Sequence, residues 1–451
     1  MADLRRLLEE GKNIFGTDGV RGEAGSELTV GLALAIGQAA GSYLRGGPVL
    51  VGRDTRRSGP MLSLALQAGF HSVGIDTIDV GVLPSGGISH LTSTSAATMA
   101  AIVSASHNPA ADNGIKLLSS KGSKLADDVE RDIERRIRDA GSTSSIGHSI
   151  GTRFEDSDAL YRYIDHLAAA SRYNLSGLRI ALDCANGAAF KAAPELFNRL
   201  KADVVTFGDA PDGTNINLDC GATHPEALAR LARGRIGLSF DGDADRLIVV
   251  DEEGKVANGD VVMAIIARHL KASDTLKNNL LVATVMSNLG LHKSMKEIGV
   301  ELVTTKVGDR YVAEALEERK GTLGGEQSGH IIFTESGSTG DGLMTAVRLL
   351  NVVAGTGKEL RELRAEAMTE YPQVLVNVPI RRGVDVDSAR DLWEEVKEVE
   401  EELGDDGRVL VRPSGTEPLV RVMVEALTAE QASDYADRLA AVAADSLGKG
   451  A

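Results

Sequence analysis

The stretch VLVGRDTRRSGPMLSLALQAGFHSVGIDTIDV, residues 49–80, decides the fold of this chain. It begins with an apolar strand over Val49–Gly52 and continues through the polar loop RDTRRSG. The apolar-periodic run Pro60–Ser72 predicts a helix, and Ile75–Val80 predicts a second strand. A strand, a helix and a second strand in this order are typical of α/β layering.

The same order of elements recurs twice more. The second copy begins at Leu178 with LRIALDCANG, continues through the helix-like AAFKAAPELFNRL and closes with a strand over Asp203–Phe207. The third copy begins at Leu280 with LLVATVMSNLG, continues through LHKSMKEIG and closes with Val300–Thr305. Spacings of roughly a hundred residues are too long for a solenoid repeat, so they predict related domains in series.

The rest of the chain predicts a linker and a different last domain. The Ser/Gly-rich stretch GSTSSIG, Gly141–Gly147, separates the first copy from the second. Beyond about Tyr371 the pattern becomes a strand, VLVNVPI, a charged helix around Trp393, a strand pair and a last helix. Thr428 opens that helix, with Gln431 at the spacing of a capping box. The fourth unit is therefore expected to be a small α+β domain.

Composition limits the partners and the compartment. The 451 residues include 49 Lys and Arg against 65 Asp and Glu, a formal net charge of −16, which disfavours nucleic acid or an anionic membrane as the main partner. Cys184 and Cys220 form no CxxC pair and are too few to staple a chain this long, which indicates a reducing compartment. The first residues, MADLRRLLEEGK, have no apolar core, and no run of about 18 apolar residues occurs. The expected location is the cytoplasm.

The first loop with candidate chemistry is SASHNPAADNGIKLL, Ser104–Leu118. Its Asn-Pro and Asn-Gly steps favour turns, so Ser106 and His107 are expected on a loop and not buried in a strand. The Ser106 hydroxyl could carry a phosphoryl group, and Lys116 is a candidate proton acceptor if burial or neighbours lower its pKa. Taken alone, the loop is also compatible with a plain turn.

The second loop, FDGDADRLIVVD, carries Asp241, Asp243 and Asp245 between two apolar strands. On a locally extended chain the three carboxylates would lie on one side and repel one another unless a cation neutralised them. Mg²⁺ prefers such oxygen ligands and commonly shares them with phosphate. An EF-hand would use Glu252 at the twelfth position, but Arg246 occupies the position that needs glycine. A solvated acidic turn remains the structural alternative.

The third loop is GGEQSGH, Gly324–His330. Its glycines are expected to let the backbone approach a ligand closely. Glu326, Ser328 and His330 offer acceptors and donors suited to sugar hydroxyls or an amine. A Gly-rich turn without function is the alternative.

The fourth loop, RPSGTEPLVR, lies in a predicted strand-to-strand turn. Two guanidinium groups, two hydroxyls and exposed backbone N–H groups there could form an anion-binding nest. The groups are those of Arg412, Ser414, Thr416 and Arg421, grouped around Gly415. A plain hairpin turn with charged flanks is the alternative.

Together with NIFGTDGVRG near the start, these four loops in this order resemble the phosphohexomutase superfamily, from about Asn13 to Glu425. The resemblance implies an α/β fold of four domains around a central cleft, three with one related mixed-sheet fold and a smaller C-terminal α+β domain. The expected domains are 1–147 with the phosphoserine loop, 148–251 with the Mg-binding loop, 252–368 with the sugar-binding loop and 369–451 with the phosphate-binding loop.

The resemblance also implies the roles of individual residues. Ser106 is the expected phosphoserine, and its phosphate with Asp241, Asp243 and Asp245 is expected to bind Mg²⁺. Glu326 and Ser328 are expected to contact the sugar. The phosphate that does not react is expected to bind Arg412, Ser414, Gly415, Thr416 and Arg421. Positions that stabilise transfer or move protons are Arg21, His107, Lys116, Arg246 and His330.

The expected reaction interconverts glucosamine 6-phosphate and glucosamine 1-phosphate through a phosphoserine and a 1,6-bisphosphate, which also acts as activator, and feeds UDP-N-acetylglucosamine synthesis. Gln327 suggests this branch, because enzymes for mannose and glucose phosphates often carry Met there. Those enzymes are the alternative, followed by a Mg²⁺-dependent sugar phosphatase and a phosphosugar sensor. Ser104, where Thr is frequent, and Pro413 depart from the family pattern. A homodimer is expected only by family analogy.

Overall fold

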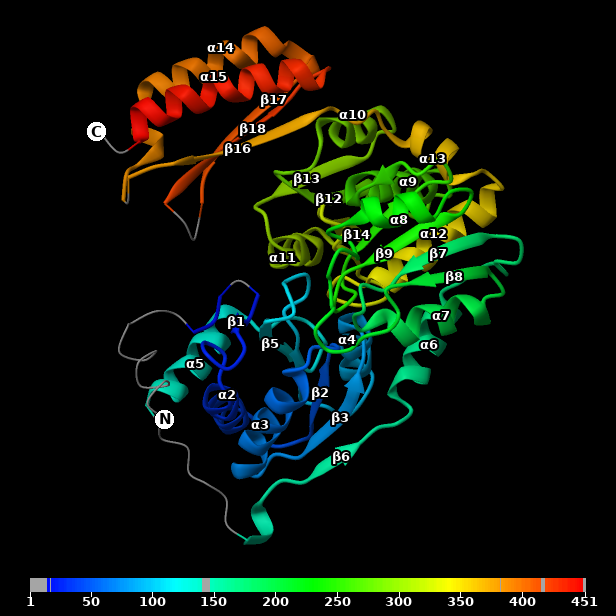
Figure 1. Cartoon of the computed structure of the whole chain (residues 1–451), viewed down its shortest axis with the longest axis vertical. Coiled ribbons are helices and arrows are strands. Elements are labelled where there is room, and N and C mark those ends of the chain that lie inside the picture. Colours follow the sequence, from blue (N-terminus) through cyan, green and yellow to red (C-terminus); the bar gives the residue numbers. More distant parts are fainter. Residues whose placement is uncertain (1–13, 17, 140–146, 382, 415–417, 449–451) are drawn as a thin grey trace. The chain divides into compact units, whose positions relative to one another are not determined.

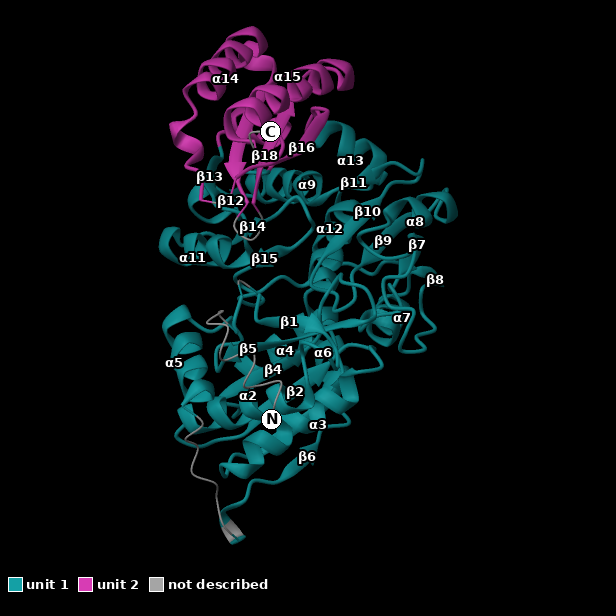
Figure 2. Cartoon of the chain, turned by 60° about the vertical axis from the view of Figure 1, so that its left-hand side comes forward, with its two compact units in different colours: residues 1–286, 300–367 teal, residues 287–299, 368–451 magenta. Residues whose placement is uncertain are grey.

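The computed structural model describes residues 14–16, 18–139, 147–381, 383–414 and 418–448. The described part forms two compact units, one of residues 1–286 and 300–367 and the other of residues 287–299 and 368–451 (Figure 2). The predicted linker over Gly141–Gly147 and the charged N-terminal segment fall almost entirely outside the described residues.

The first sheet has the strand order β1-β5-β4-β2-β3-β6 (Figure 1). Its strands are β1 (Val20–Glu23), β2 (Val49–Arg53), β3 (Thr77–Val82), β4 (Met99–Val103), β5 (Asp112–Ser119) and β6 (Arg153–Glu155). β2, β3, β4 and β6 run parallel, whereas β5 is antiparallel to both β4 and β1. A hydrophobic core joins this sheet to three helices, and a fourth helix contacts β2 and β4. The three are α2 (Val30–Tyr43), α3 (Gly59–Ser72) and α5 (Asp127–Arg138), and the fourth is α4 (Ser85–Ser93).

The second sheet has the order β11-β10-β9-β7-β8. Its strands are β7 (Arg179–Asp183), β8 (Asp203–Phe207), β9 (Ile236–Phe240), β10 (Leu247–Val250) and β11 (Val256–Ala257), and its helices are α6 (Ala159–Ala169), α7 (Ala189–Arg199) and α8 (Pro225–Leu231). β7 is parallel to β8 and β9, while β9 and β10 form an antiparallel hairpin. The turn of that hairpin, residues 241–246, carries Asp241, Asp243 and Asp245 and is the acidic loop.

The third sheet has the order β13-β12-β14-β15. Its strands are β12 (Leu280–Thr284), β13 (Glu301–Thr305), β14 (Leu323–Gly325) and β15 (Ile331–Phe333), and the helices of this region are α9 (Gly259–Ala272), α11 (Asp309–Arg319), α12 (Gly342–Thr356) and α13 (Leu360–Ala367). β14 and β15 are antiparallel neighbours, and the loop that carries Glu326 and Ser328 connects them.

The three predicted copies are confirmed as strand, helix and strand. In each copy the two strands are parallel neighbours: β2 with β3, β7 with β8 and β12 with β13. In the first copy the second strand begins at Thr77 and not at Ile75. The N–H groups of Gly74 and Ile75 donate to carbonyls at the end of α3, and Gly74 has a φ of +83°, so the chain is still closing the helix there.

The C-terminal unit has a three-stranded antiparallel sheet in the order β16-β18-β17. Its elements are α10 (Leu289–Glu297), β16 (Gln373–Pro379), α14 (Arg390–Leu403), β17 (Arg408–Pro413), β18 (Leu419–Glu425) and α15 (Ala429–Leu447). The Thr428 hydroxyl accepts the N–H of Gln431 at 3.2 Å, as the capping-box spacing predicts. The buried carboxylate of Glu425 accepts from Arg408 and from the N–H of Leu289, which ties α10 to this unit. The predicted fold class, α/β with a smaller C-terminal α+β domain, is confirmed.

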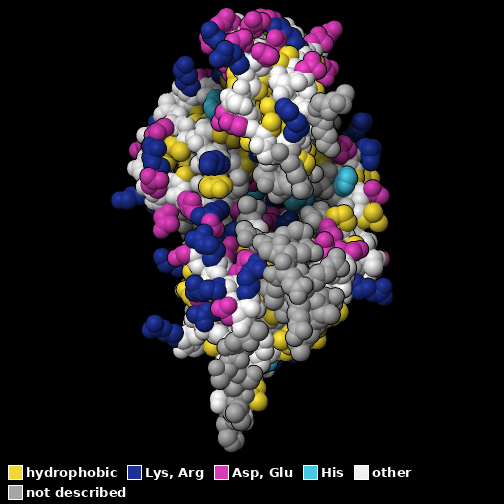
Figure 3. All heavy atoms as spheres, turned by 90° about the vertical axis from the view of Figure 1, so that its left-hand side faces the viewer, with side chains coloured by type: hydrophobic (Ala, Val, Ile, Leu, Met, Phe, Trp, Pro, Cys, Tyr) yellow, Lys and Arg dark blue, Asp and Glu magenta, His cyan; other side chains and the backbone are white. Residues whose placement is uncertain are grey.

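The surface carries both signs of charge. Figure 3 shows Lys and Arg side chains interspersed with Asp and Glu over the coloured part of one face. None of the helices in the described ranges combines the length and apolar character needed to span a bilayer.

Candidate active site

Ser106 lies on the loop between β4 and β5, as predicted, but the loop does not display it to solvent. Its side chain is buried, and its hydroxyl donates to Oδ2 of Asp241 at 2.6 Å. Ser106 has a φ of 51°, an unusual conformation for a residue with a side chain. The Nδ1 of His107 lies 3.2 Å from the Ser106 hydroxyl oxygen. The acidic loop of the second sheet therefore covers the predicted nucleophile directly.

The three aspartates converge at a turn and not on an extended chain. Ala244 has a φ of 58° and donates its N–H to the carbonyl of Asp241. The turn brings carboxylate oxygens of Asp241, Asp243 and Asp245 within 4.8 Å of one another. The prediction that the three carboxylates lie together is confirmed, but the extended geometry expected for the loop is wrong. A residue in the left-handed region closes the loop instead.

Burial and mutual repulsion disturb the ionisation of these carboxylates. Burial and the charge of Asp245 raise the pKa of Asp241 to about 6, and burial with both neighbouring aspartates raises the pKa of Asp243 well above its usual value. Burial also disfavours the charged form of Asp245, but His330, Lys116 and Arg246 hold its pKa well below the usual range. Repulsion of this kind is what a bound cation would relieve.

The donor set fits a hard divalent cation. Among the described residues, Oδ1 of Asp243 and Oδ1 of Asp245 are buried without a hydrogen-bond partner. Buried carboxylate oxygens left unpaired are costly, and Mg²⁺ takes oxygen ligands of this kind. Glu252, the EF-hand alternative, instead accepts the N–H groups of Leu360 and Arg361 at the start of α13. The geometry at this turn therefore suits a magnesium site shared with Ser106.

Lys116 on β5 is surrounded by carboxylates. Its Nζ lies 2.8 Å from Oδ1 of Asp18 and 3.8 Å from Oδ2 of Asp309. Burial alone would lower the pKa of Lys116, but Asp18 and Asp309, with help from the acidic loop, raise it well above its usual value. The expectation of a lowered pKa for Lys116 is therefore wrong. Lys116 is a fixed cation at neutral pH. Arg21 also pairs with Asp18.

Arg246 and His330 each contact one of the three aspartates. The backbone N–H of Arg246 donates to Oδ1 of Asp241 at 3.1 Å. The Nδ1 of His330 lies 3.4 Å from Oδ2 of Asp245, and its Nε2 accepts the N–H of Gly340. Burial disfavours the charged imidazole, whereas Asp245 raises the pKa of His330 to about 9. The contact with Gly340 requires Nε2 without a proton, so this geometry is that of the neutral ring with its proton on Nδ1, although Asp245 favours the charged ring.

His107 is held in its neutral form. Burial, together with the positive charges of Arg246 and Arg21, lowers the pKa of His107 to about 4. A neutral imidazole beside the Ser106 hydroxyl can accept a proton.

The loop between β14 and β15 places Glu326 beside the start of α11. The N–H of Gly308 donates to Oε1 of Glu326 at 2.9 Å, and the Ser328 hydroxyl lies 3.5 Å from Oε2. One glycine of this loop, Gly329, is required by packing within the protein. A Cβ on Gly329 would lie 2.3 Å from the carbonyl oxygen of Leu247, so the missing side chain makes room for β10.

The loop between β17 and β18 belongs to the C-terminal unit. Arg412 and Arg421 face each other across β17 and β18. Burial and the charge of Arg421 lower the pKa of Arg412, and the Nε atoms of both have no hydrogen-bond partner in the described part of the chain. Ser414 follows β17, whereas Gly415 and Thr416 lie outside the described residues. Two facing guanidinium groups favour an anion between them.

Sequence reasoning missed three residues that the fold brings to this site. Asp18 lies inside the quoted segment NIFGTDGVRG, between two glycines. Asp309 follows the third copy's second strand, and residues at the carboxyl ends of parallel strands are common ligand contacts. Ser85, the first residue of α4, donates its hydroxyl to Oδ2 of Asp243 at 2.6 Å. Only the position after a strand end could have indicated Asp309 in advance.

Four family models match the chain. They describe the α/β/α domains I, II and III of phosphoglucomutase/phosphomannomutase, at residues 12–144, 161–254 and 258–371, and its C-terminal domain at 375–442. The chain therefore belongs to the phosphoglucomutase/phosphomannomutase family. The predicted resemblance to the phosphohexomutases is confirmed.

Two similar relatives are named phosphoglucosamine mutase. The chain is 50% identical to the phosphoglucosamine mutase of Thermobifida fusca, covering 96% of this chain and 98% of that one. It is 48% identical to the phosphoglucosamine mutase of Listeria monocytogenes, covering 95% and 97%.

Solved structures share the fold. A phosphoglucomutase/phosphomannomutase family protein from Burkholderia thailandensis has a TM-score of 0.82 at 26% identity, covering 96% of this chain and 97% of that one. The N-acetylphosphoglucosamine mutase of Aspergillus fumigatus, solved with GlcNAc-6P and magnesium, has a TM-score of 0.70 at 19% identity, covering 98% and 99%.

Proposed function

We propose that this chain is a phosphoglucosamine mutase, an isomerase that interconverts glucosamine 6-phosphate and glucosamine 1-phosphate. The observation that carries the proposal is the buried Ser106 hydroxyl, 2.6 Å from a cluster of three converging aspartates. A serine beside a cation site is suited to hold and release a phosphoryl group. The substrate class follows the relatives that are 48 to 50% identical over nearly their whole length.

Asp241, Asp243, Asp245 and the phosphate on Ser106 would hold Mg²⁺. When bound, the ion would neutralise charge on the transferring phosphoryl group. The fungal N-acetylphosphoglucosamine mutase solved with magnesium supports the choice of metal. The unpaired Oδ1 atoms of Asp243 and Asp245 support it independently.

The reaction would proceed in two transfers. In the first, the bond from phosphorus to the Ser106 oxygen breaks, a bond from phosphorus to the oxygen of the free sugar hydroxyl forms, and the proton of that hydroxyl passes to the Ser106 oxygen. The resulting 1,6-bisphosphate turns end over end. In the second, the bond from the other phosphorus to the sugar oxygen breaks, a bond from that phosphorus to the Ser106 oxygen forms, and the proton of the serine hydroxyl passes by way of His107 to the sugar oxygen. Ser106 must therefore already carry a phosphoryl group before turnover begins.

Other side chains around Ser106 would transfer protons, stabilise charge and hold the acidic loop in place. His107, neutral and 3.2 Å from the serine oxygen, would take the serine proton in the second transfer. Lys116, Arg21 and Arg246 would stabilise the charge of the phosphoryl group in flight. His330, with its proton on Nδ1, would hold Asp245 in place. This assigns Lys116 an electrostatic role in place of the proton transfer predicted for it.

The substrate would be oriented by two loops. Glu326 and Ser328 would bind the sugar, and the carboxylate of Glu326 suits the ammonium group of glucosamine. The phosphate that does not react would bind the nest around Gly415, made of Arg412, Ser414, Thr416 and Arg421. Two facing arginines in the C-terminal unit support that assignment.

The remaining expectations are part of the same proposal. We expect domain boundaries at residues 147, 251 and 368. We also expect a hexose 1,6-bisphosphate as the activator and a small phosphosugar as the ligand. The cytoplasm as location rests on the reducing compartment that the cysteines indicate, and a homodimer rests on family analogy.

The test is coupled turnover of glucosamine 6-phosphate, glucose 6-phosphate and mannose 6-phosphate side by side, with Mg²⁺ and a trace of hexose 1,6-bisphosphate. A large advantage in kcat/KM for glucosamine 6-phosphate is the expected result. If glucose or mannose phosphate is preferred, the chain is a phosphoglucomutase or phosphomannomutase. Release of free phosphate without any isomer would make it a sugar phosphatase.

A further inference from the structure

Arg56, in the loop that follows β2, is a buried residue whose guanidinium group lies behind the Ser106 loop. Its Nε donates to Oδ2 of Asp54 at 2.8 Å. Its Nη atoms donate to four backbone carbonyls of the loop, those of Ser106, Asn108, Pro109 and Asp112. A guanidinium has five N–H donors, and all five are used here.

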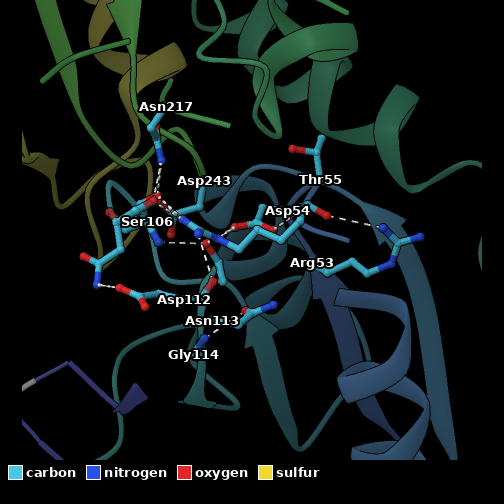
Figure 4. Close-up of polar contacts among 12 residues, drawn as sticks. Arg53, Asp54, Thr55, Ser106, Asp112, Asn113, Gly114, Asn217 and Asp243 are labelled. Atoms are coloured by element: carbon cyan, nitrogen blue, oxygen red, sulfur yellow. Dashed lines mark hydrogen bonds and ion pairs between the residues drawn. The ribbon is translucent and has the colours of Figure 1, made fainter. Parts of the chain in front are cut away.

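These contacts enclose Ser106 on both sides of its backbone. Its N–H donates to Oγ of Ser104 at 2.9 Å, and that hydroxyl donates to Oδ2 of Asp54 at 2.6 Å. The carbonyl of Ser106 accepts from Arg56 at 2.9 Å, and Arg56 is paired with the same Asp54 oxygen. The N–H and the carbonyl of Ser106 are thus tied to one buried ion pair. Figure 4 shows this network around Ser106 and Asp54.

Ser106, which these contacts surround, has an unusual backbone conformation. A φ of 51° is costly for serine and persists only where surrounding contacts fix it. The second domain adds a further contact, because Nδ2 of Asn217 donates to the carbonyls of Ser106 and Asn108 (Figure 4). With the carbonyl held on this side, the Ser106 hydroxyl is directed at Asp241.

We propose that Arg56 is a positioning residue for phosphoryl transfer: it fixes the backbone of residues 106–112 so that the Ser106 oxygen stays aligned with the acidic loop. The proposal rests on the proposed role of Ser106. Lysine offers three donors without the planar fork, so Arg56→Lys keeps the charge but cannot reach all of the loop carbonyls. The loop would sample other conformations, and phosphoryl transfer depends on alignment.

The experiment compares wild type, Arg56→Lys and the matched control Arg53→Lys, whose guanidinium makes one long hydrogen bond, to the Asp54 carbonyl at 3.3 Å. Two measurements are made on each protein: steady-state kinetics with glucosamine 6-phosphate, and hydrogen–deuterium exchange of peptides covering residues 104–113. For Arg56→Lys we expect kcat to fall by at least roughly 10-fold with KM changed less than about 3-fold, and faster exchange confined to the loop. Arg53→Lys is expected to match wild type in both.

The two readouts separate the possible failures. Unchanged kcat in Arg56→Lys, or unchanged exchange in the loop, would overturn the positioning role. If Arg56→Lys does not fold, Asn217→Ala removes two bonds to the same carbonyls and is expected to show the same split between kcat and KM. If wild type has no mutase activity, the proposed function fails, and the exchange measurement still decides whether Arg56 holds the loop.

Discussion

The ammonium group of Lys116 and the carboxylate of Asp18 form an ion pair at 2.8 Å in the buried part of the site. Burial alone would lower the pKa of Lys116, but the negative charges of Asp18 and Asp309 raise it. The raised pKa keeps Lys116 protonated, and therefore positively charged, at neutral pH.

The pH dependence of turnover follows from this pair. Because the pKa of Lys116 is raised, kcat is expected to show no loss from lysine deprotonation between about pH 7 and pH 10, where an unperturbed lysine begins to lose its proton. Asp18→Asn removes the closer carboxylate, so an alkaline decline in kcat is expected to appear, and Asp309→Asn is expected to do the same more weakly. The measurement is the pH profile of kcat for wild type, the two asparagine variants and Lys116→Arg. An alkaline decline in wild type that disappears in Lys116→Arg would contradict the raised pKa.

Gly242 in the acidic loop sets how closely that loop approaches Ser106. A Cβ at this position would lie 2.4 Å from the carbonyl oxygen of Ser106 and 2.9 Å from Nδ2 of Asn217. Gly242→Ala must push the two loops apart, so we expect a loss of about 1–3 kcal/mol of unfolding free energy. The displaced serine is expected to lower kcat by roughly 10- to 100-fold.

Urea denaturation and steady-state kinetics check the Gly242 prediction. Gly337→Ala is the matched control, since its Cβ would meet nothing within 4 Å. Equal activity of the two alanine variants would show that the spacing between the loops does not matter for catalysis.

Asp243 is expected to control the metal requirement. One of its oxygens accepts from Ser85 and the other is buried without a hydrogen-bond partner in the described structure, so Asp243→Asn removes a charge and a candidate ligand together. The Mg²⁺ concentration for half-maximal activity is expected to rise at least roughly 10-fold. Asp212→Asn, at an exposed aspartate, is the control. An unchanged Mg²⁺ dependence in Asp243→Asn would remove this residue from the metal site.

Much of this site could be predicted from local sequence. The three strand–helix–strand copies, the Ser106 loop and the acidic hairpin lie where apolar runs and turn residues place them. The turn at Ala244 could not be predicted, because alanine rarely adopts a positive φ and nothing in the sequence indicates one there. The sign of the Lys116 shift depends on Asp18 and Asp309, which only the packed structure brings to one side chain. Arg56 is one of two adjacent arginines, and burial alone distinguishes it from exposed Arg57.

The transfer of a phosphoryl group through Ser106 is the central step of the proposed reaction. The direct measurement is the intact mass and phosphopeptide map of wild type and Ser106→Ala after incubation with glucose 1,6-bisphosphate, followed by addition of glucosamine 6-phosphate. We expect one phosphoryl group on Ser106 in wild type, none in the variant, and its transfer to the sugar phosphate on addition. Full turnover by Ser106→Ala, or loss of the phosphoryl group from wild type only to water, would contradict the account.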